Sequence, residues 1–265
     1  MTRQGEHAGT WAVGARLAPG RLTLTGALGS AHAHAHAAVQ VLLVTSGQAV
    51  LTDGRGRSRR VRAAVIPAGA VHALDTGDAR GAMVYLDPAD RRARALTARL
   101  DRHAAAAEPS GGQAVLWQAA ADPALTALDA APDLDTRTGE RALTALAAWP
   151  DAPPPPPSGA LGRALALLPE LIAAGRPVRL DTVAAQVGLS GSRLRHLFTE
   201  QLGLPFTACV RWARLQAAMA VVRDGGTLTA AAHAAAFTDS AHLTRVFHAM
   251  FGLAPSQAAR HLHWH

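Results

Sequence analysis

The chain has no lysine, one cysteine and few aromatic residues, and these scarcities exclude an intrachain disulfide and a core built from aromatic side chains. All 26 basic residues are arginine. The single cysteine, Cys209, excludes an intrachain disulfide and is typical of a reducing compartment; it lies among apolar residues and is predicted to be a small core residue. With 5 Trp, 5 Phe and 1 Tyr, the cores must be built mainly from Ala, Leu and Val. The hydrophobic fraction of 49% is sufficient for such cores.

Long apolar runs are also lacking. A membrane-spanning helix needs about 18 or more consecutive apolar residues, and every such stretch here is interrupted by charges or helix breakers. Charged and polar residues fill the first positions of the chain, which does not fit a signal peptide. We therefore expect a cytoplasmic protein with no membrane partner.

Positive charge is concentrated in one part of the chain. The net charge is +7. Residues 158–265 carry 10 arginines against 5 acidic residues, whereas residues 1–157 carry 16 against 14. A basic region beside a nearly neutral one is typical of a protein that binds a polyanion through one domain.

An uninterrupted proline run, Pro153 to Pro157, divides the chain. Such a run adopts a stiff polyproline II conformation and joins neither a packed helix nor a central strand. We predict an N-terminal domain over residues 1–152, a linker over 153–158 and a C-terminal domain over 159–265.

The N-terminal part alternates short apolar runs with turn residues. Strands are predicted over residues 22–28, 39–44, 49–51, 61–66 and 82–86, and a hairpin turn over residues 52–56. Helices are predicted over residues 88–105, 114–130 and 138–148. Short strands at this spacing indicate an antiparallel sandwich or barrel, here followed by helices.

The C-terminal part is predicted to be all helical and contains one pattern twice. Helices are predicted over residues 161–174, 181–187, 192–202, 205–222, 228–235, 240–251 and 256–261. The pattern Leu194-Arg-His-Leu197-Phe198-Thr-Glu-Gln-Leu202-Gly203 recurs as Leu243-Thr-Arg-Val246-Phe247-His-Ala-Met-Phe251-Gly252, 49 residues later. Ser190 and Asp239 stand where helix N-caps belong, and Gly188 where a turn between helices favours positive φ. The fold class is thus α+β with two domains, the second built from two helix-turn-helix units.

Each copy has a buried stripe and an outward face. The apolar residues of each copy fall three or four positions apart, which places them on one side of a helix. The outward faces carry Ser192, Arg195 and His196 in the first copy and Ser240, Thr244 and Arg245 in the second. Arginine bonds guanine in the major groove with both arms of its fork, and Ser and Thr reach base edges or phosphates. We therefore predict that these six residues contact DNA.

These motifs resemble the AraC/XylS family of transcriptional regulators. The resemblance covers residues 160–262 and rests on both repeats, Leu180-Asp-Thr-Val-Ala184-Ala-Gln-Val-Gly188-Leu-Ser190, Arg214-Leu215-x-x-Ala218, Phe237-x-Asp239 and Phe247-x-x-x-Phe251-Gly252-x-x-Pro255-Ser256. It implies two helix-turn-helix units, about 180–202 and 228–251, joined by a helix over about 205–222 and reading successive major-groove segments of promoter or operator DNA. It also implies a homodimer, formed through helices within residues 88–148, and contact with RNA polymerase. One departure is Ala236, where the family usually has Gly; alanine at positive φ costs about 1 kcal/mol.

A histidine run stands in the N-terminal part. His32, His34 and His36 alternate, so on a strand their three imidazoles would share one face. With Gln40, Gly47 and the later Pro67-x-Gly69-x-x-His72, the run resembles the two cupin motifs, with Gln40 where metal-binding cupins have Glu. The resemblance implies that His34, His36, Gln40 and His72 converge inside a cupin-like barrel.

Three roles remain open for these residues: internal hydrogen bonding, contact with a small-molecule effector, or binding of a divalent transition metal by His34, His36 and His72. His72 is alternatively a capping residue after the strand that ends at Ile66. The tail residues His261, His263 and His265 form a second metal candidate, although a frayed chain end is the default there.

The sequence therefore predicts a transcription regulator, not an enzyme, that requires no cofactor and is controlled by a small molecule bound in the barrel. The alternatives are a metal-responsive regulator and a metal-dependent cupin enzyme with an appended DNA-binding domain.

Overall fold

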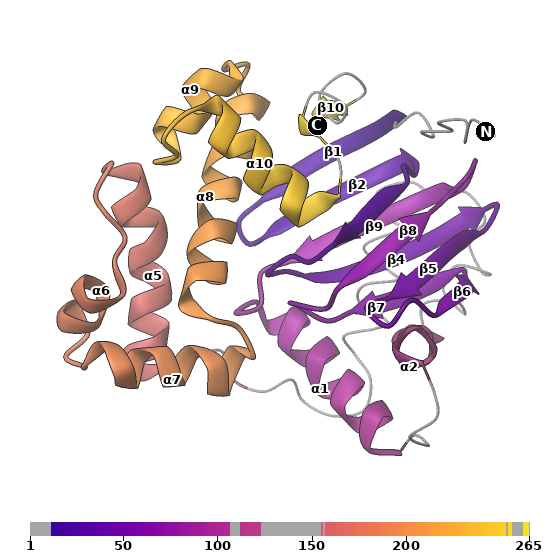
Figure 1. Ribbon diagram of the computed structural model, residues 1–265, viewed down its shortest axis with the longest axis horizontal. Helices are drawn as coiled ribbons and strands as arrows, with labels where there is room; N and C mark the ends of the chain where they lie inside the picture. Colours follow the sequence, from indigo (N-terminus) through magenta and orange to yellow (C-terminus); the bar gives the residue numbers. More distant parts are fainter. Residues whose placement is uncertain are drawn as a thin grey trace, which may run out of the picture.

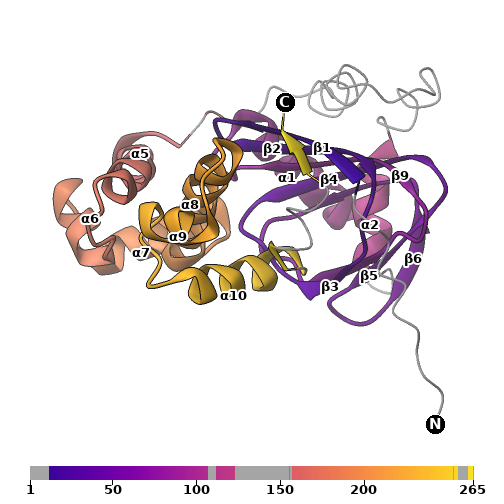
Figure 2. The same ribbon diagram turned by 90° about the horizontal axis from the view of Figure 1, so that it is seen from above.

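The structure is a computed structural model that describes residues 12–106, 112–122, 155, 157–252, 254–255 and 262–264. A barrel-like pair of β-sheets forms the N-terminal domain, and a group of helices lies at one end of it (Figures 1 and 2). Within the described ranges, no helix is both long and apolar enough to cross a membrane.

The barrel is built from two sheets. Its strands are β1 (Ala12–Ala18), β2 (Arg21–Ala27), β3 (Ala31–His34), β4 (Val39–Ser46), β5 (Ala49–Asp53), β6 (Ser58–Val61), β7 (Ala63–Ile66), β8 (His72–Asp75) and β9 (Arg80–Leu86). One sheet has the order β10-β1-β2-β9-β4-β7 and the other the order β3-β8-β5-β6. Neighbouring strands are antiparallel except for β10 (Leu262–Trp264), which runs parallel to β1. The apolar residues that face inward form the core between the sheets.

Most predicted strands are present, with one correction. The runs at 22–28, 39–44, 49–51 and 82–86 correspond to β2, β4, β5 and β9. The predicted strand over 61–66 is wrong as a single element, because the chain changes sheets there: β6 pairs with β5, and β7 pairs with β4. The carbonyl oxygen of Arg62, between them, accepts a hydrogen bond from Val44 N–H. The predicted hairpin turn is confirmed by the hydrogen bond from Asp53 N–H to the Arg57 carbonyl oxygen.

Two helices follow the barrel. Helix α1 (Arg91–Ala106) corresponds to the prediction for 88–105. Helix α2 (Gln113–Ala119) packs on β5, β6 and β7 and buries Trp117. The predicted helix over 114–130 is wrong as a single element, because α2 ends at Ala119 and turns follow at residues 120–121. Residues 123–130 and the predicted helix at 138–148 lie outside the described residues.

The C-terminal domain is helical, as predicted. Its helices are α5 (Gly159–Ala173), α6 (Leu180–Gln186), α7 (Gly191–Leu202), α8 (Phe206–Arg223), α9 (Leu228–Ala234) and α10 (Ser240–Phe251). The pairs α6–α7 and α9–α10 lie at the two ends of α8, which joins them (Figure 1). The α8 side chains Trp212 and Cys209 are buried, as predicted for the cysteine. The predicted helix at 256–261 lies outside the described residues.

The two domains touch at several places. The end of α10 packs against β3, where His32 N–H donates a hydrogen bond of 3.2 Å to the carbonyl oxygen of Gly252. The ring of Phe251 lies edge-on to Tyr85 of β9, with the centroids 5.3 Å apart. Strand β10 then adds to β1 at the edge of the larger sheet (Figure 2). The expectation of a frayed tail is therefore wrong for residues 262–264.

Candidate DNA-reading helices and a buried histidine cluster

The first helix-turn-helix unit is formed by α6 and α7. Ser190 caps α7, because its side-chain oxygen accepts a hydrogen bond from Arg193 N–H at 3.3 Å. Gly188 in the turn has φ +76°, and Gly203 ends α7 with φ +66°. Leu194 and Phe198 are completely buried on the inner side of α7. The N-cap and the positive φ at Gly188 are both confirmed.

The second unit is formed by α9 and α10 and repeats this local chemistry. Asp239 caps α10 by accepting a hydrogen bond from His242 N–H at 2.6 Å. Gly252 ends the helix with φ +68°. Ala236, at the turn, has φ +57° and is the one residue other than glycine with positive φ within the described ranges. The strain expected at this alanine is therefore present.

The predicted reading residues lie on the outer faces of the two helices, with one difference between them. Ser192, Arg195 and His196 are exposed on α7. On α10, Arg245 is exposed but Ser240 and Thr244 are half-buried, and the Thr244 hydroxyl donates to the Ser240 carbonyl oxygen at 2.8 Å.

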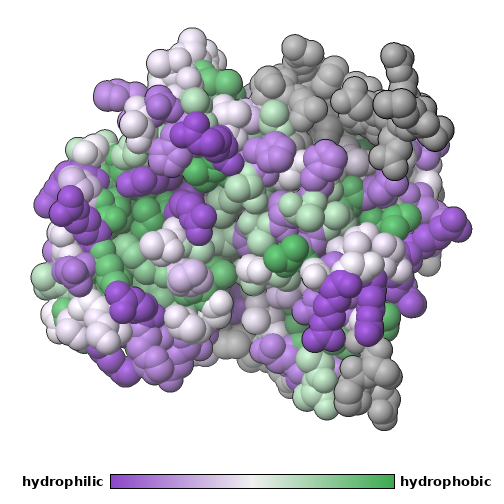
Figure 3. Space-filling view, viewed as in Figure 1, coloured by the Kyte–Doolittle hydropathy of each residue, from purple (hydrophilic) through white to green (hydrophobic). Residues whose placement is uncertain are grey.

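The His196 Nε2 atom lies 3.5 Å from a Glu200 carboxylate oxygen, so this imidazole has an acidic neighbour one helical turn away. In Figure 3, hydrophilic residues gather along the outer edge of the helical domain, over α6 and α7. Helix α7 thus presents two exposed arginines, Arg193 and Arg195, and α10 presents Arg245, each from a helix that is capped at both ends.

The second site is a histidine cluster inside the barrel, and its membership corrects the sequence prediction. Strand β3 ends at His34, and its pairing with β8 is irregular between Ala31 and His34. His32 is consequently exposed, so the three alternating imidazoles do not share a face. His34 pairs across the strands with His72, the first residue of β8, which is 1% exposed and is not a surface cap. His36 completes the cluster.

Backbone carbonyl groups fix the orientation of all three rings. The Nδ1 atoms of His34, His36 and His72 lie 2.7, 2.8 and 3.0 Å from the carbonyl oxygens of His32, Ala38 and Ala70. A carbonyl oxygen only accepts, so each Nδ1 carries the hydrogen and donates. In a neutral imidazole the other nitrogen, Nε2, then presents a lone pair.

Burial keeps these rings neutral. Burial, together with the neighbouring His36, lowers the pKa of His34 to about 4. Burial also lowers the pKa of His36, and it lowers the pKa of His72 well below 6.5. Three Nε2 lone pairs therefore converge in the barrel; one ligand atom from each ring lies within 4.8 Å of the others.

Gln40 closes the cluster from the opposite sheet. Its Oε1 atom lies 2.9 Å from His36 Nε2 and 3.0 Å from His72 Nε2. An amide oxygen and an imidazole lone pair both accept, so no hydrogen lies between these atoms while the rings are neutral. If the Gln40 side-chain amide is turned over, its two N–H groups can donate to the Nε2 atoms of His36 and His72. Alternatively, a bound cation can be coordinated by these two Nε2 atoms and by the Gln40 Oε1 atom. The Nε2 atoms of His34 and Gln40 are buried without a hydrogen-bond partner among the described residues.

Two aromatic residues that sequence reasoning did not single out enclose the cluster. Tyr85 lies edge-on to His36, with centroids 5.2 Å apart, and Trp117 lies edge-on to His72 at 6.4 Å. An aromatic residue on a buried strand or helix is typical of any core, so no signal in the sequence sets these two apart. Tyr85 also contacts Phe251 of α10, which places the cluster one residue away from the second reading unit.

Comparison with known proteins agrees with this geometry. Residues 183–261 match a family described as "Helix-turn-helix domain", which spans both repeats. No curated protein sequence matches the chain.

Solved structures of ToxT from Vibrio cholerae have the same fold. A single-residue variant of apo ToxT is 11% identical, with a TM-score of 0.58 over 94% of this chain and 100% of that one. A second ToxT structure is 12% identical, with a TM-score of 0.57 over 92% and 98% of the two chains. Wild-type ToxT with a bound unsaturated fatty acid is 11% identical, with a TM-score of 0.53 over 91% and 93%. At these identities the likeness establishes the two-domain fold, a β-rich domain followed by a helical one.

Proposed function

We propose that this chain, whose C-terminal domain is a helix-turn-helix domain of the AraC type, is a sequence-specific DNA-binding transcription regulator controlled by a ligand of its barrel. One observation carries the proposal: two capped helices from one repeated unit each present an exposed arginine on a basic domain. Because the two outer faces differ, each chain would read an asymmetric site. Dimerisation within residues 88–148, contact with RNA polymerase and action in the cytoplasm remain predictions.

The test compares three arginines of the helical domain. Arg195→Ala and Arg245→Ala should each weaken binding to the preferred site about ten- to a hundredfold, the value of one bidentate contact to guanine. Each should relax base preference at a different position, measured by sequencing DNA selected from a random library. Arg176→Ala is the control, because it removes the same charge at an exposed position after α5, away from both outer faces. If all three variants select the same site as the wild type, the assignment of reading helices is wrong.

The second candidate function is a response to a divalent transition metal. We propose His34, His36 and His72 as its ligands through Nε2, with Gln40 Oε1 beside them. The support is the fit of the donor set: rings oriented by backbone carbonyls, neutral through burial, and one of them unpartnered at Nε2. Imidazole ligands suit Zn, Ni, Fe and Cu. The burial of all three imidazoles favours sensing over catalysis. A purely hydrogen-bonding or effector-contacting role is the outcome if no metal binds.

His34 and His32, two residues apart on β3, provide a matched pair of variants for this test. His34→Gln should weaken Zn²⁺ binding by about a hundredfold, since it removes one ligand, whereas His32→Gln should leave it unchanged, since His32 is exposed. Gln40→Glu should strengthen binding, because it supplies an anionic ligand. Titration calorimetry on protein stripped of metal measures all three. Equal affinities of the His34 and His32 variants would exclude the cluster as the site.

A route from the cluster to DNA lies in β3. His34 belongs to the cluster, and His32, two residues earlier, donates to the end of α10 through its N–H. A ligand that fixes His34 would thereby stabilise one arrangement of β3 and favour the state in which α10 is docked on the barrel.

A further inference from the structure

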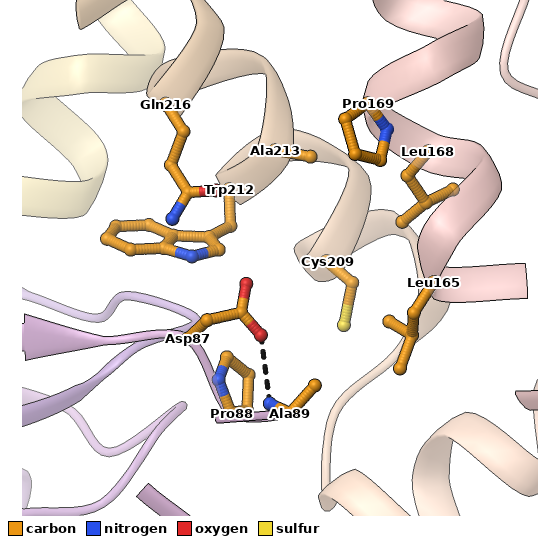
Figure 4. Close-up of a pocket in the computed structure, with 10 residues that line it drawn as sticks. All are labelled: Asp87, Pro88, Ala89, Leu165, Leu168, Pro169, Cys209, Trp212, Ala213 and Gln216. Carbon is orange, nitrogen blue, oxygen red and sulfur yellow. Dashed lines mark hydrogen bonds between the residues drawn. The ribbon is translucent and has the colours of Figure 1, made fainter. Parts of the chain in front are cut away.

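A second internal space lies between the two domains, away from the histidine cluster. It is a cavity of about 190 Å³ walled by the turn after β9 and by helices α5 and α8 (Figure 4). Its ten lining residues are Asp87, Pro88, Ala89, Leu165, Leu168, Pro169, Cys209, Trp212, Ala213 and Gln216. An occupant would contact both domains.

The charged side chains that line this cavity are of one sign only. Asp87 is an acid, and none of the ten described lining residues carries a positive charge. One Asp87 oxygen, Oδ1, accepts the N–H of Ala89 at 2.9 Å, and this bond stays within the same turn. Burial raises the pKa of the Asp87 carboxyl; the N–H groups of Ala89 and Trp212 partly offset this rise, and Asp90 reinforces it. None of the described residues that line the cavity therefore supplies a counter-ion to this carboxyl.

An aromatic ring faces the carboxyl across the cavity. The indole of Trp212 lies above Asp87 in Figure 4 and is 1% exposed. Its N–H approaches the carboxyl but does not meet hydrogen-bond geometry, and it has no other partner among the described residues. A carboxylate together with an aromatic face is the usual receptor for an organic cation. The remaining walls are mostly apolar, with Leu165 and Leu168 on α5, and Gln216 adds one neutral amide.

The volume restricts the size of the occupant. Pockets for drug-sized ligands usually measure about 300–1,000 Å³, which is well above 190 Å³. At about 30 Å³ per water molecule, the space corresponds to about six waters, enough for an ammonium group on a short apolar chain.

We infer that this interdomain cavity is a binding site for a small organic cation, a protonated amine with a short apolar body, held by the Asp87 carboxylate against the Trp212 indole. This site differs from the barrel site of the proposed function in place and in ligand chemistry, and it stands whether or not DNA or metal binds as proposed.

The test uses three probes of equal length that differ in charge: pentylammonium, 1-pentanol and pentanoate, titrated into the full chain in the presence of a metal chelator. Pentylammonium should bind saturably and about tenfold or more tightly than the other two, since only the cation pairs with Asp87. Asp87→Asn should weaken pentylammonium binding by about tenfold or more, which corresponds to the loss of one charge-assisted hydrogen bond.

Asp90→Asn is the matched control, because Asp90 lies three residues further on and is not part of the cavity wall. It should leave the affinity within about twofold of wild type, as expected for a neighbouring charge outside the site. Asp87→Asn keeps the size of the side chain and removes a buried charge, so it should fold, and an unchanged thermal midpoint verifies this. No saturable binding of pentylammonium, equal binding of 1-pentanol or pentanoate, or undiminished binding by Asp87→Asn would each overturn the inference.

Discussion

The two glycines that end the reading helices offer a direct test of how the helical domain is held on the barrel. Gly203 ends α7 with φ +66° and Gly252 ends α10 with φ +68°, so alanine at either position adopts the same unfavourable conformation. That conformation costs about 1–2 kcal/mol for a residue with a Cβ atom. The surroundings of the two positions differ completely.

A Cβ atom on Gly203 meets nothing within 4 Å, whereas one on Gly252 would lie 2.5 Å from the His32 carbonyl oxygen and 2.8 Å from His34 Nδ1. These are atoms of the barrel strand β3, and the nearer one is backbone, so the contact must open. Opening loses the hydrogen bond from His32 N–H, worth about 1 kcal/mol, and part of the burial of Phe251, worth up to about 3 kcal/mol.

We therefore expect Gly203→Ala to lower the free energy of unfolding by about 1 kcal/mol and Gly252→Ala by about 3 kcal/mol or more. Hydrogen exchange measured by mass spectrometry locates the difference. Gly252→Ala should speed exchange in the peptide that contains the His32 amide, and Gly203→Ala should not. Equal destabilisation by the two variants, with the His32 amide equally protected in both, would refute the docking of α10 on β3.

Two further predictions concern local conformation and pH. Ala236→Gly relieves the positive φ of +57° and should stabilise the chain by about 1 kcal/mol, raising the thermal midpoint by about 3 °C; a lower midpoint would contradict this. Asp53 accepts the N–H groups of Arg55, Arg57 and Gln113. Burial raises the pKa of Asp53, but these donors and the Arg57 charge lower it more, to below 3.8, so its stabilisation is present above that pH and is lost as the pH falls through the folded pKa. Asp53→Asn should reduce stability at neutral pH and flatten its acid dependence, as chemical denaturation at several pH values would show; an unaltered pH profile would exclude the carboxylate as the cause.

The helical domain could be predicted almost entirely from the sequence because its signals are local. A cap such as Ser190 or Asp239 lies three residues from the N–H that it accepts, and the buried stripe repeats every three or four residues. Even the strained turn at Ala236 follows from one residue that departs from the AraC/XylS pattern. Interactions that close within one helical turn need no knowledge of the rest of the fold.

The barrel is harder to predict from the sequence, because each of its strands is defined by pairing partners that lie far away in the chain. Strands β3 and β8 are only four residues each, and their alanine, histidine, leucine and aspartate residues do not show which face is buried. The alternating rule failed at His32 because the pairing of β3 with β8 is irregular there. The cupin resemblance nevertheless indicates His72 and Gln40 by position and not by periodicity, and both lie beside His36 in the barrel; their role in binding an effector or a metal stays a prediction.

The contact between the domains carried no signal in the sequence at all. The parallel pairing of β10 with β1 joins Leu262 to Val13, and three residues with no turn nearby do not mark a strand. The hydrogen bond between His32 and Gly252 joins residues that are equally remote in the chain. These remote pairings place a four-residue strand between the barrel interior and the second reading helix. On that strand His34 is buried and His32 is exposed, so a change at the first residue would reach the second through only the two peptide units that flank Ala33. For this reason we assign the coupling of the two domains to β3, which contacts both the histidine cluster and the end of α10.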